Sequence, residues 1–236
     1  MKIDTIFSSH GCNTSKGCLK LRQRYDTYNS LSFYSDCQHN ISLSAHACGN
    51  DVIISDTEKS KELSLLRNHK NVITCLSFIK DYSKGIEESN FIPETYLMSA
   101  DSVGTFTIWK YKNEEWSVLC TINAHEGSIE CIYSTCIFNE ETKSYENLLI
   151  TTGIDQTVKL WKLANDQCIL YTQYKAKGDT YFISITAMLL NYNELCIFLG
   201  SVDSQIYVYS LDIYISSSAS HDTPSLVLIT TIKVYN

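Results

Sequence analysis

The chain has 236 residues, of which 44% are hydrophobic, 19% are charged and 11% are aromatic, with 16 tyrosines but only 2 prolines. Tyr, Ile, Val and Thr favour half-buried strands, so the composition indicates β structure, and the length suits one large all-β unit or two small domains. The formal net charge is −7, whereas a domain that binds duplex nucleic acid normally carries a basic excess, so we expect no direct nucleic-acid partner.

The amino terminus predicts no targeting or membrane segment. Residues 1–7 contain no basic region followed by an apolar run, so they do not match a secretory signal. No stretch approaches the ~20 consecutive apolar residues that span a bilayer. We therefore expect a soluble cytoplasmic protein, with the nucleus as a second location and no membrane partner.

The 10 cysteines are scattered along the chain. They stand at Cys12, Cys18, Cys37, Cys48, Cys75, Cys120, Cys131, Cys136, Cys168 and Cys196. No CxxC occurs, and no Cys/His quartet has the short paired spacing with which zinc ligands close a tetrahedron. We expect no metal and no cofactor, and in a reducing compartment we expect these thiols to behave as small buried hydrophobes.

Predicted strands recur in units of similar layout. The first and weakest copy runs from Ser44 to Asp56. The later units contain, in chain order, the runs Val72–Phe78, Leu97–Trp109 and Trp116–Ile122, then Ser128–Tyr133, Leu149–Trp161 and Cys168–Tyr174, then Cys196–Tyr209 and Leu226–Ile232. Segments 97–109 and 149–161 align without a gap, and 197–209 fits the same frame. Each unit thus supplies four short strands separated by polar turns, which is typical of one propeller blade.

The spacing of the aromatic residue that ends each aligned segment sets the period. Trp109 and Trp161 are 52 residues apart, and Trp161 and Tyr209 are 48 apart. A WD40 repeat is usually ~40–45 residues long, and polar insertions account for the excess.

Over residues 40–236 the chain resembles the WD40 family. In that family a His before the first strand, a Ser or Thr on the second, an Asp in the following turn and a Trp on the third form a hydrogen-bonded tetrad. The resemblance implies a complete tetrad in the third unit, at His125, Thr151, Asp155 and Trp161.

The other units match this tetrad only in part. The second unit has His69, Ser99 and Trp109, but Val103 stands at the Asp position, so we expect His69 to lack one acceptor and its blade to depend more on apolar packing. The fourth unit keeps Asp203 but has Leu199 and Tyr209 at the Thr and Trp positions, with Gly178-Asp179 where Gly-His would stand.

The fold class predicted is therefore an all-β WD40 propeller of about four blades. The expected blades are a divergent first at about 10–66, then about 69–123, 125–174 and 179–232. A closed ring usually needs more blades, because closure removes exposed sheet edges. The chain would then be part of a longer protein, an engineered fragment of one, or an open array that pairs with something else, and an isolated open edge predicts oligomers or poor solubility.

Three polar stretches interrupt the pattern. Residues 80–90 and 139–146 fall at the same place in successive units, between the first and second strands, and 216–224 falls between the third and fourth. They are interpreted as solvated loops. The alternative is that insertions recurring on one rim mark a partner surface, since loops carry function more often than their scaffold.

Two segments carry a more specific resemblance. The start of the chain at Ser8–Asn13 with the first unit at Ala47–Ile54 resembles the amino-terminal part of the Elongator complex protein 2 family, and residues 199–209 resemble that family's fourth blade. That family has two propellers, so this chain would cover part of the first. The resemblance implies a non-catalytic scaffold subunit of the assembly that modifies wobble uridines in tRNA, with its catalytic and large scaffold subunits as partners.

Enzyme signatures are missing from the sequence. It contains no GxSxG elbow, P-loop, HExxH or Gly-rich dinucleotide fingerprint, so we predict no catalytic residue. The pair of His125 and Asp155 is similar to a proton relay, but its place in the repeat frame makes it structural. The alternative function is a WD40 adaptor that recognises a peptide or protein client in a ubiquitin ligase or chromatin complex. Only three arginines are present, at Arg22, Arg24 and Arg67, which disfavours a phosphate-reading pocket.

Overall fold

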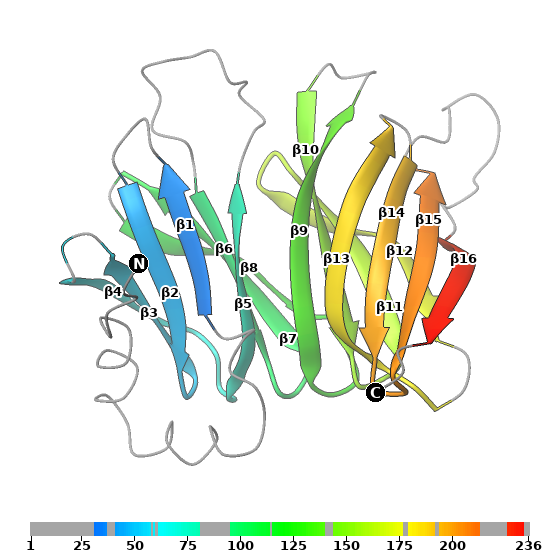
Figure 1. Cartoon of the computed structure of the whole chain (residues 1–236). Coiled ribbons are helices and arrows are strands. Elements are labelled where there is room, and N and C mark those ends of the chain that lie inside the picture. Colours follow the sequence, from blue (N-terminus) through cyan, green and yellow to red (C-terminus); the bar gives the residue numbers. More distant parts are fainter. Residues whose placement is uncertain are drawn as a thin grey trace, which may run out of the picture.

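The computed structural model describes residues 31–36, 41–57, 59, 61–80, 95–113, 115–139, 144–176, 179–191, 194–212 and 226–233. Within these residues the chain forms four antiparallel sheets of four strands, and in each sheet the strands lie side by side in chain order (Figure 1). We call the sheets blades 1 to 4. The expectation of an all-β chain built from four-stranded units is confirmed.

The strands have the following bounds. Blade 1 contains β1 (Leu31–Asp36), β2 (Ile41–Cys48), β3 (Asp51–Asp56) and β4 (Lys61–Arg67). Blade 2 contains β5 (Ile73–Lys80), β6 (Thr95–Asp101), β7 (Thr105–Lys112) and β8 (Glu115–Asn123). Blade 3 contains β9 (Ile129–Asn139), β10 (Ser144–Gly153), β11 (Thr157–Ala164) and β12 (Gln167–Lys175). Blade 4 contains β13 (Phe182–Asn191), β14 (Glu194–Ser201), β15 (Gln205–Asp212) and β16 (Leu226–Lys233).

The blades stand next to one another as in a propeller. The first strand of each blade contacts the first strand of the next, since β1 contacts β5, β5 contacts β9, and β9 contacts β13. The last strand of each blade lies at the outer edge of its sheet. The first strands therefore form the inner side of an arc of blades, and the fourth strands form its rim.

The apolar core lies between the blades. Side chains alternate across a strand, so the middle strands of a blade present apolar residues to both neighbouring blades. The aromatic residue on each third strand packs toward the preceding blade: Trp109 joins the cluster between blades 1 and 2, Trp161 that between blades 2 and 3, and Tyr209 that between blades 3 and 4. All three are at most 5% exposed. Burial of an aromatic side chain contributes about 2–3 kcal/mol, so these residues hold the arc together.

The turn between the second and third strands has the same geometry in blades 2, 3 and 4. Gly104, Gln156 and Ser204 occupy equivalent positions, and all three have a positive φ, of 93°, 67° and 61°. In each turn the backbone N–H of this residue donates to the carbonyl three residues earlier, at 3.1–3.3 Å. At Gly104 a Cβ would lie 2.0 Å from the carbonyl oxygen of His125, so only glycine fits there.

The structure changes one of the loop expectations. Ser144–Glu146, expected in a solvated loop, form the start of β10 and pair with residues 137–139 of β9. The stretches 81–90 and 216–224, the segment Ser8–Asn13 and the start of the expected first blade at residue 10 lie outside the described residues. Among the residues that are described, no helix is long and apolar enough to cross a membrane.

Candidate functional site

Blade 3 contains a hydrogen-bonded network of the four residues expected from its sequence. His125 lies in the connection before β9, and its Nε2 is 2.8 Å from Thr151 Oγ1 on β10. The indole Nε1 of Trp161 donates to the same hydroxyl at 3.0 Å. On the other side of the ring, His125 Nδ1 is 3.0 Å from Asp155 Oδ1. The network links the connection before β9 to the second and third strands of the blade, β10 and β11.

With a neutral imidazole, the hydrogen bonds among these four residues take one consistent set of directions. The Trp161 N–H can only donate, so Thr151 accepts from it and is free to donate its own proton to His125 Nε2. The Nδ1 of His125 then carries the ring proton and donates to the Asp155 carboxylate. Each polar group thus finds a partner with the imidazole neutral, which is the condition for burying such a network.

The charge states of the pair agree with this assignment. Burial lowers the pKa of His125, and the nearby Asp155 offsets this only in part. Burial acts to raise the pKa of Asp155, but hydrogen bonds from Thr157, from His125 and from the backbone N–H of Glu126 outweigh it and lower that pKa to about 2. At neutral pH the pair therefore consists of a neutral imidazole and a carboxylate.

Blade 2 contains a complete network as well, contrary to the expectation from its sequence. Trp109 Nε1 donates to Ser99 Oγ at 2.8 Å, and that hydroxyl is 2.7 Å from His69 Nε2. His69 Nδ1 lies 3.0 Å from Asp101 Oδ2. The inference that His69 lacks an acidic partner because Val103 stands at the Asp position is wrong: the carboxylate comes from Asp101, two residues earlier, at the end of β6.

A glycine explains why the acid can stand at either of two positions. Asp101 in blade 2 is equivalent to Gly153 in blade 3. A Cβ at Gly153 would lie 2.6 Å from His125 Nδ1 and 2.9 Å from Asp155 Oδ1, so a side chain there would take the place of the Asp155 carboxylate. In blade 2 the side chain of Asp101 fills this space itself, and Val103 is left exposed. The signal in the sequence is an acid two residues after the Ser/Thr instead of a glycine.

In blade 4, other contacts hold the connection that precedes its first strand, β13. Leu199 and Tyr209 are buried, and they replace the polar network by apolar packing. Ser201, equivalent to Asp101 and Gly153, hydrogen bonds with Thr180 in the connection before β13. Asp203 contacts no His among the described residues: it accepts from Tyr207 Oη at 2.7 Å and from Gln205. Asp179 is exposed, and Gly178 lies outside the described residues.

The side chains of these networks are buried, and their hydrogen-bonding groups have partners within the protein, so they are not placed to react with a substrate. The side chain of His69 is 1% exposed and that of His125 is fully buried, so a substrate could not reach either ring. Within the described ranges no group of three or more His, Cys, Asp or Glu side chains could hold a metal ion. The networks therefore position strands, and any functional site on the described residues has to lie on a surface.

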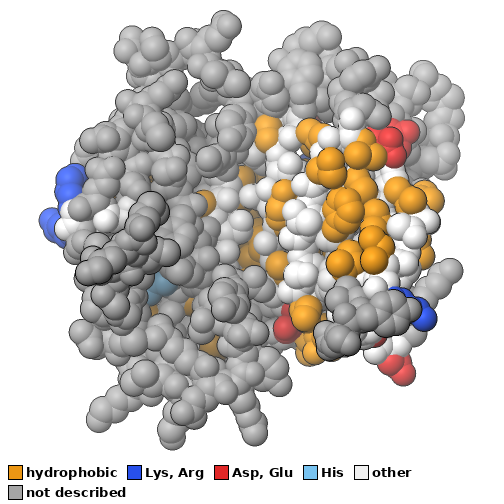
Figure 2. Space-filling model, in the orientation of Figure 1, with side chains coloured by type: hydrophobic (Ala, Val, Ile, Leu, Met, Phe, Trp, Pro, Cys, Tyr) orange, Lys and Arg blue, Asp and Glu red, His pale blue; other side chains and the backbone are white. Residues whose placement is uncertain are grey.

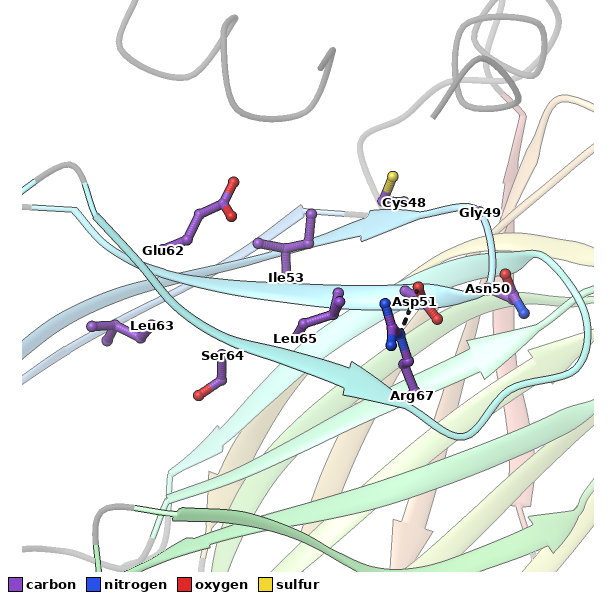
Figure 3. A pocket seen from close by; sticks show the side chains of 10 residues that line it. All are labelled: Cys48, Gly49, Asn50, Asp51, Ile53, Glu62, Leu63, Ser64, Leu65 and Arg67. Atoms are coloured by element: carbon purple, nitrogen blue, oxygen red, sulfur yellow. Dashed lines mark ion pairs between the residues drawn. The ribbon is translucent and has the colours of Figure 1, made fainter. Parts of the chain in front are cut away.

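A hollow of about 440 Å³ lies on blade 1 (Figure 3). Ile53 of β3 and Leu65 of β4 stand opposite each other in its floor. An ion pair of Arg67 Nε and Asp51 Oδ2 at 3.5 Å closes one end. In blades 2 to 4 the corresponding face packs against the preceding blade, so this hollow marks the face of blade 1 that none of the other described blades covers.

The opposite end of the arc is an apolar face on blade 4. Four apolar residues point away from blade 3: Phe198 and Ile206, which are half-buried, and Cys196 and Val208, which are buried. They are equivalent to Leu148, Ile150, Val158 and Leu160, which blade 4 buries completely. On the same face the two edge strands of the sheet, β13 and β16, carry Met188 and Val227, which are 51% and 58% exposed. Figure 2 shows hydrophobic side chains gathered over the strands of blade 4. We call this surface the open face.

Comparison with known proteins gives one match in sequence and a likeness in fold. No protein-family model matches the chain. The chain is 25% identical over 163 residues to Elongator complex protein 2 of Dictyostelium discoideum, and the match covers 67% of this chain but only 16% of that protein. A chain in the crystal structure of the mitotic checkpoint complex is similar with a TM-score of 0.52 and 15% identity, over 81% of this chain and 49% of that one. The fold is that of WD40-type propeller blades.

Proposed function

We propose that this chain is a non-catalytic WD40 scaffold that acts as a subunit of an Elongator complex and so supports the modification of wobble uridines in tRNA. The observation that supports this most directly is the sequence match over 67% of the chain to the Dictyostelium protein of that complex. Its partners would be the catalytic subunit and the large scaffold subunit. It would work in the cytoplasm, with the nucleus as a second location.

The distribution of polar groups supports a scaffold over an enzyme. In blades 2 and 3 the His and Asp side chains are buried and hydrogen-bonded to each other, so they position strands and do not act on a substrate. The net charge of −7 disfavours direct binding of tRNA, so the chain would support the modification reaction by binding other proteins.

The open face is the contact surface that we assign to this role. Large exposed apolar patches on a protein surface mark interaction sites, and terminal repeats that face water carry polar outer surfaces instead. Blade 4 has the apolar residues that blades 2 and 3 use to bind the next blade. Its partner is therefore expected to offer a sheet layer of the same kind, with an aromatic side chain at the place that Tyr209 takes against blade 3.

Affinity purification tests the proposal. The protein is tagged in its own cells, recovered in moderate salt, and the proteins that remain bound are identified by mass spectrometry. We expect stoichiometric recovery of a radical-SAM acetyltransferase subunit together with a large scaffold subunit. A matched variant with charges on the open face, Met188→Lys with Val227→Lys, is expected to lose a bound subunit while it stays folded.

Other outcomes of the same experiment contradict the proposal. Recovery of a cullin or of a histone-modifying assembly would make the protein a WD40 adaptor for a peptide or protein client. Recovery of no stoichiometric partner would remove the Elongator assignment as well.

A further inference from the structure

Two cysteines of neighbouring blades face each other across the interface of blades 2 and 3. Cys120 lies on β8 opposite Ile108, which faces blade 3, and Cys168 lies on β12 opposite Leu163, which faces blade 2. Both thiols pack against the same apolar cluster between these blades. Both are free and half-buried at the outer rim of the arc, where small molecules in solution can reach them.

The two thiols also interact with each other electrostatically. A hydrogen bond from the Cys168 thiol to the Cys120 sulfur lowers the pKa of Cys120, because it stabilises the thiolate more than burial disfavours it. The same hydrogen bond raises the pKa of Cys168, with burial as a second cause. A thiolate next to a thiol that can resolve it is the arrangement found at redox-sensitive cysteines.

The other blade interfaces do not repeat this pair. The positions equivalent to Cys120 and Cys168 hold Ser64 and Trp116 between blades 1 and 2, and Thr172 and Leu226 between blades 3 and 4. The pair is therefore a local property of one interface and no requirement of blade packing.

The inner strands of the same two blades offer an internal comparison. Cys75 on β5 and Cys131 on β9 are both buried. Burial raises the pKa of Cys75 well above its usual value and that of Cys131 to about 11. These thiols have almost no thiolate at neutral pH and should be inert.

We propose that Cys120 and Cys168 form a reversible disulfide that links blades 2 and 3 when the protein meets a peroxide. The Cys120 thiolate attacks one oxygen of hydrogen peroxide, which breaks the O–O bond, gives a sulfenic acid on Cys120 and, with one proton, releases water. The Cys168 thiol then attacks the sulfenic sulfur, forms the S–S bond and expels a second water. The two thiols lose two electrons in total, and the peroxide takes them up. A dithiol reductant reverses the step.

A peptide map of the full chain tests the proposal. The protein is treated with hydrogen peroxide, its remaining thiols are alkylated, and it is digested without reduction. We expect the peptides of Cys120 and Cys168 to be joined, and to separate after dithiothreitol. Before oxidation, Cys120 should react with iodoacetamide at least about tenfold faster than Cys75 and Cys131 at neutral pH.

Thermal unfolding gives a second readout that a merely structural thiol pair would not move. Oxidation should raise Tm by about 5–10 °C, because the bond closes a long loop across two blades. Cys120→Ser and Cys168→Ser should each abolish the rise. Cys136→Ser, which removes a half-buried thiol of β9, should keep it.

Two results would overturn the inference. One is a peroxide-treated wild-type chain in which Cys120 and Cys168 remain in separate peptides, or in which either of them is joined to another of the ten cysteines. The other is an equal rise in Tm in the two serine variants. The map on the wild-type chain decides the matter even if a variant does not fold.

Discussion

The imidazole of His69 lies 3.0 Å from the carboxylate of Asp101, both are buried, and the acid comes from the end of the same strand that carries Ser99. In blade 3 the partner of His125 stands two residues later, in the turn. Both acids also accept backbone N–H groups of that turn: Asp101 from Val103 and Thr105, and Asp155 from Thr157. The two blades thus reach the same hydrogen-bonded arrangement from different positions of the chain.

Replacing Asp101 should destabilise the protein strongly. Asp101→Ala removes an acceptor from His69 and from two backbone N–H groups in a buried site, which we expect to cost about 2–4 kcal/mol in the free energy of unfolding. Denaturant unfolding followed by tryptophan fluorescence measures the change. Asp203→Ala removes the turn acid of blade 4, which stands at the position of Asp155 and makes only exposed hydrogen bonds, and should cost less than about 1 kcal/mol.

A rescue experiment tests whether the two positions are interchangeable. Asp101→Gly with Val103→Asp transplants the layout of blade 3 into blade 2. It should recover at least about half of the loss of Asp101→Gly alone, since the new acid can reach His69 through the space that a glycine leaves. Equal stabilities of the single and the double variant would show that the turn of blade 2 cannot present an acid in this way.

The Thr151 hydroxyl should couple His125 and Trp161 energetically. Thr151→Val keeps the shape but leaves the imidazole Nε2 and the indole N–H without their partner, for an expected cost of about 2–3 kcal/mol. Trp161→Phe removes the indole N–H. In a double-mutant cycle these two changes should cost about 1 kcal/mol less together than the sum of their separate costs. Additive costs would contradict a shared network.

The repeat could be read from the sequence because it combines periodic apolar runs with residues of restricted use. The apolar runs at Trp116–Ile122, Cys168–Tyr174 and Leu226–Ile232 predict strands, and they are β8, β12 and β16. Period-two alternation with turn residues is a local property, so it can be recognised without knowing the neighbours of a strand. The positions of His125 and Thr151 follow from the same frame.

Contacts between separate segments could not be read in this way. An ungapped alignment of the repeats places the acid of blade 2 at Val103, because the alignment ignores that a side chain from Asp101 can reach the same space. That Cys120 and Cys168 face the same interface depends on how the outer strands of two blades lie against each other. Ser144–Glu146 is polar yet continues a strand, because β9 is long enough to pair with it. In each case the outcome depends on tertiary packing, which the local sequence pattern does not specify.

The open face should drive self-association of the isolated chain. None of the other described blades covers this face, which exposes Met188 and Val227. Burial of such surface against a second sheet contributes roughly 25 cal/mol per Å². Met188→Lys with Val227→Lys should shift the protein to monomers in light scattering coupled to size exclusion. Val118→Lys, at an exposed position on β8 of blade 2, adds a lysine away from the open face as the control and should leave the association unchanged.

Acidification should weaken blade 3 in two steps whose signs follow from the pKa shifts. Burial lowers the pKa of His125 in the folded chain. Below pH ~6.5 this histidine is therefore protonated in the unfolded chain before it is protonated in the folded chain, and the free energy of unfolding falls as the pH decreases. The pKa of Asp155 is lowered from 3.8 to about 2, so its contribution is complete above pH ~4 and is lost between there and pH ~2. Urea unfolding at pH 7.5 and 5.5 measures the first step, and His125→Gln should reduce that difference because glutamine cannot take up the proton. Nuclear magnetic resonance titration of the His125 ring checks the cause directly: a midpoint above 6.5, or an unchanged pH dependence in the glutamine variant, would contradict the neutral, buried imidazole.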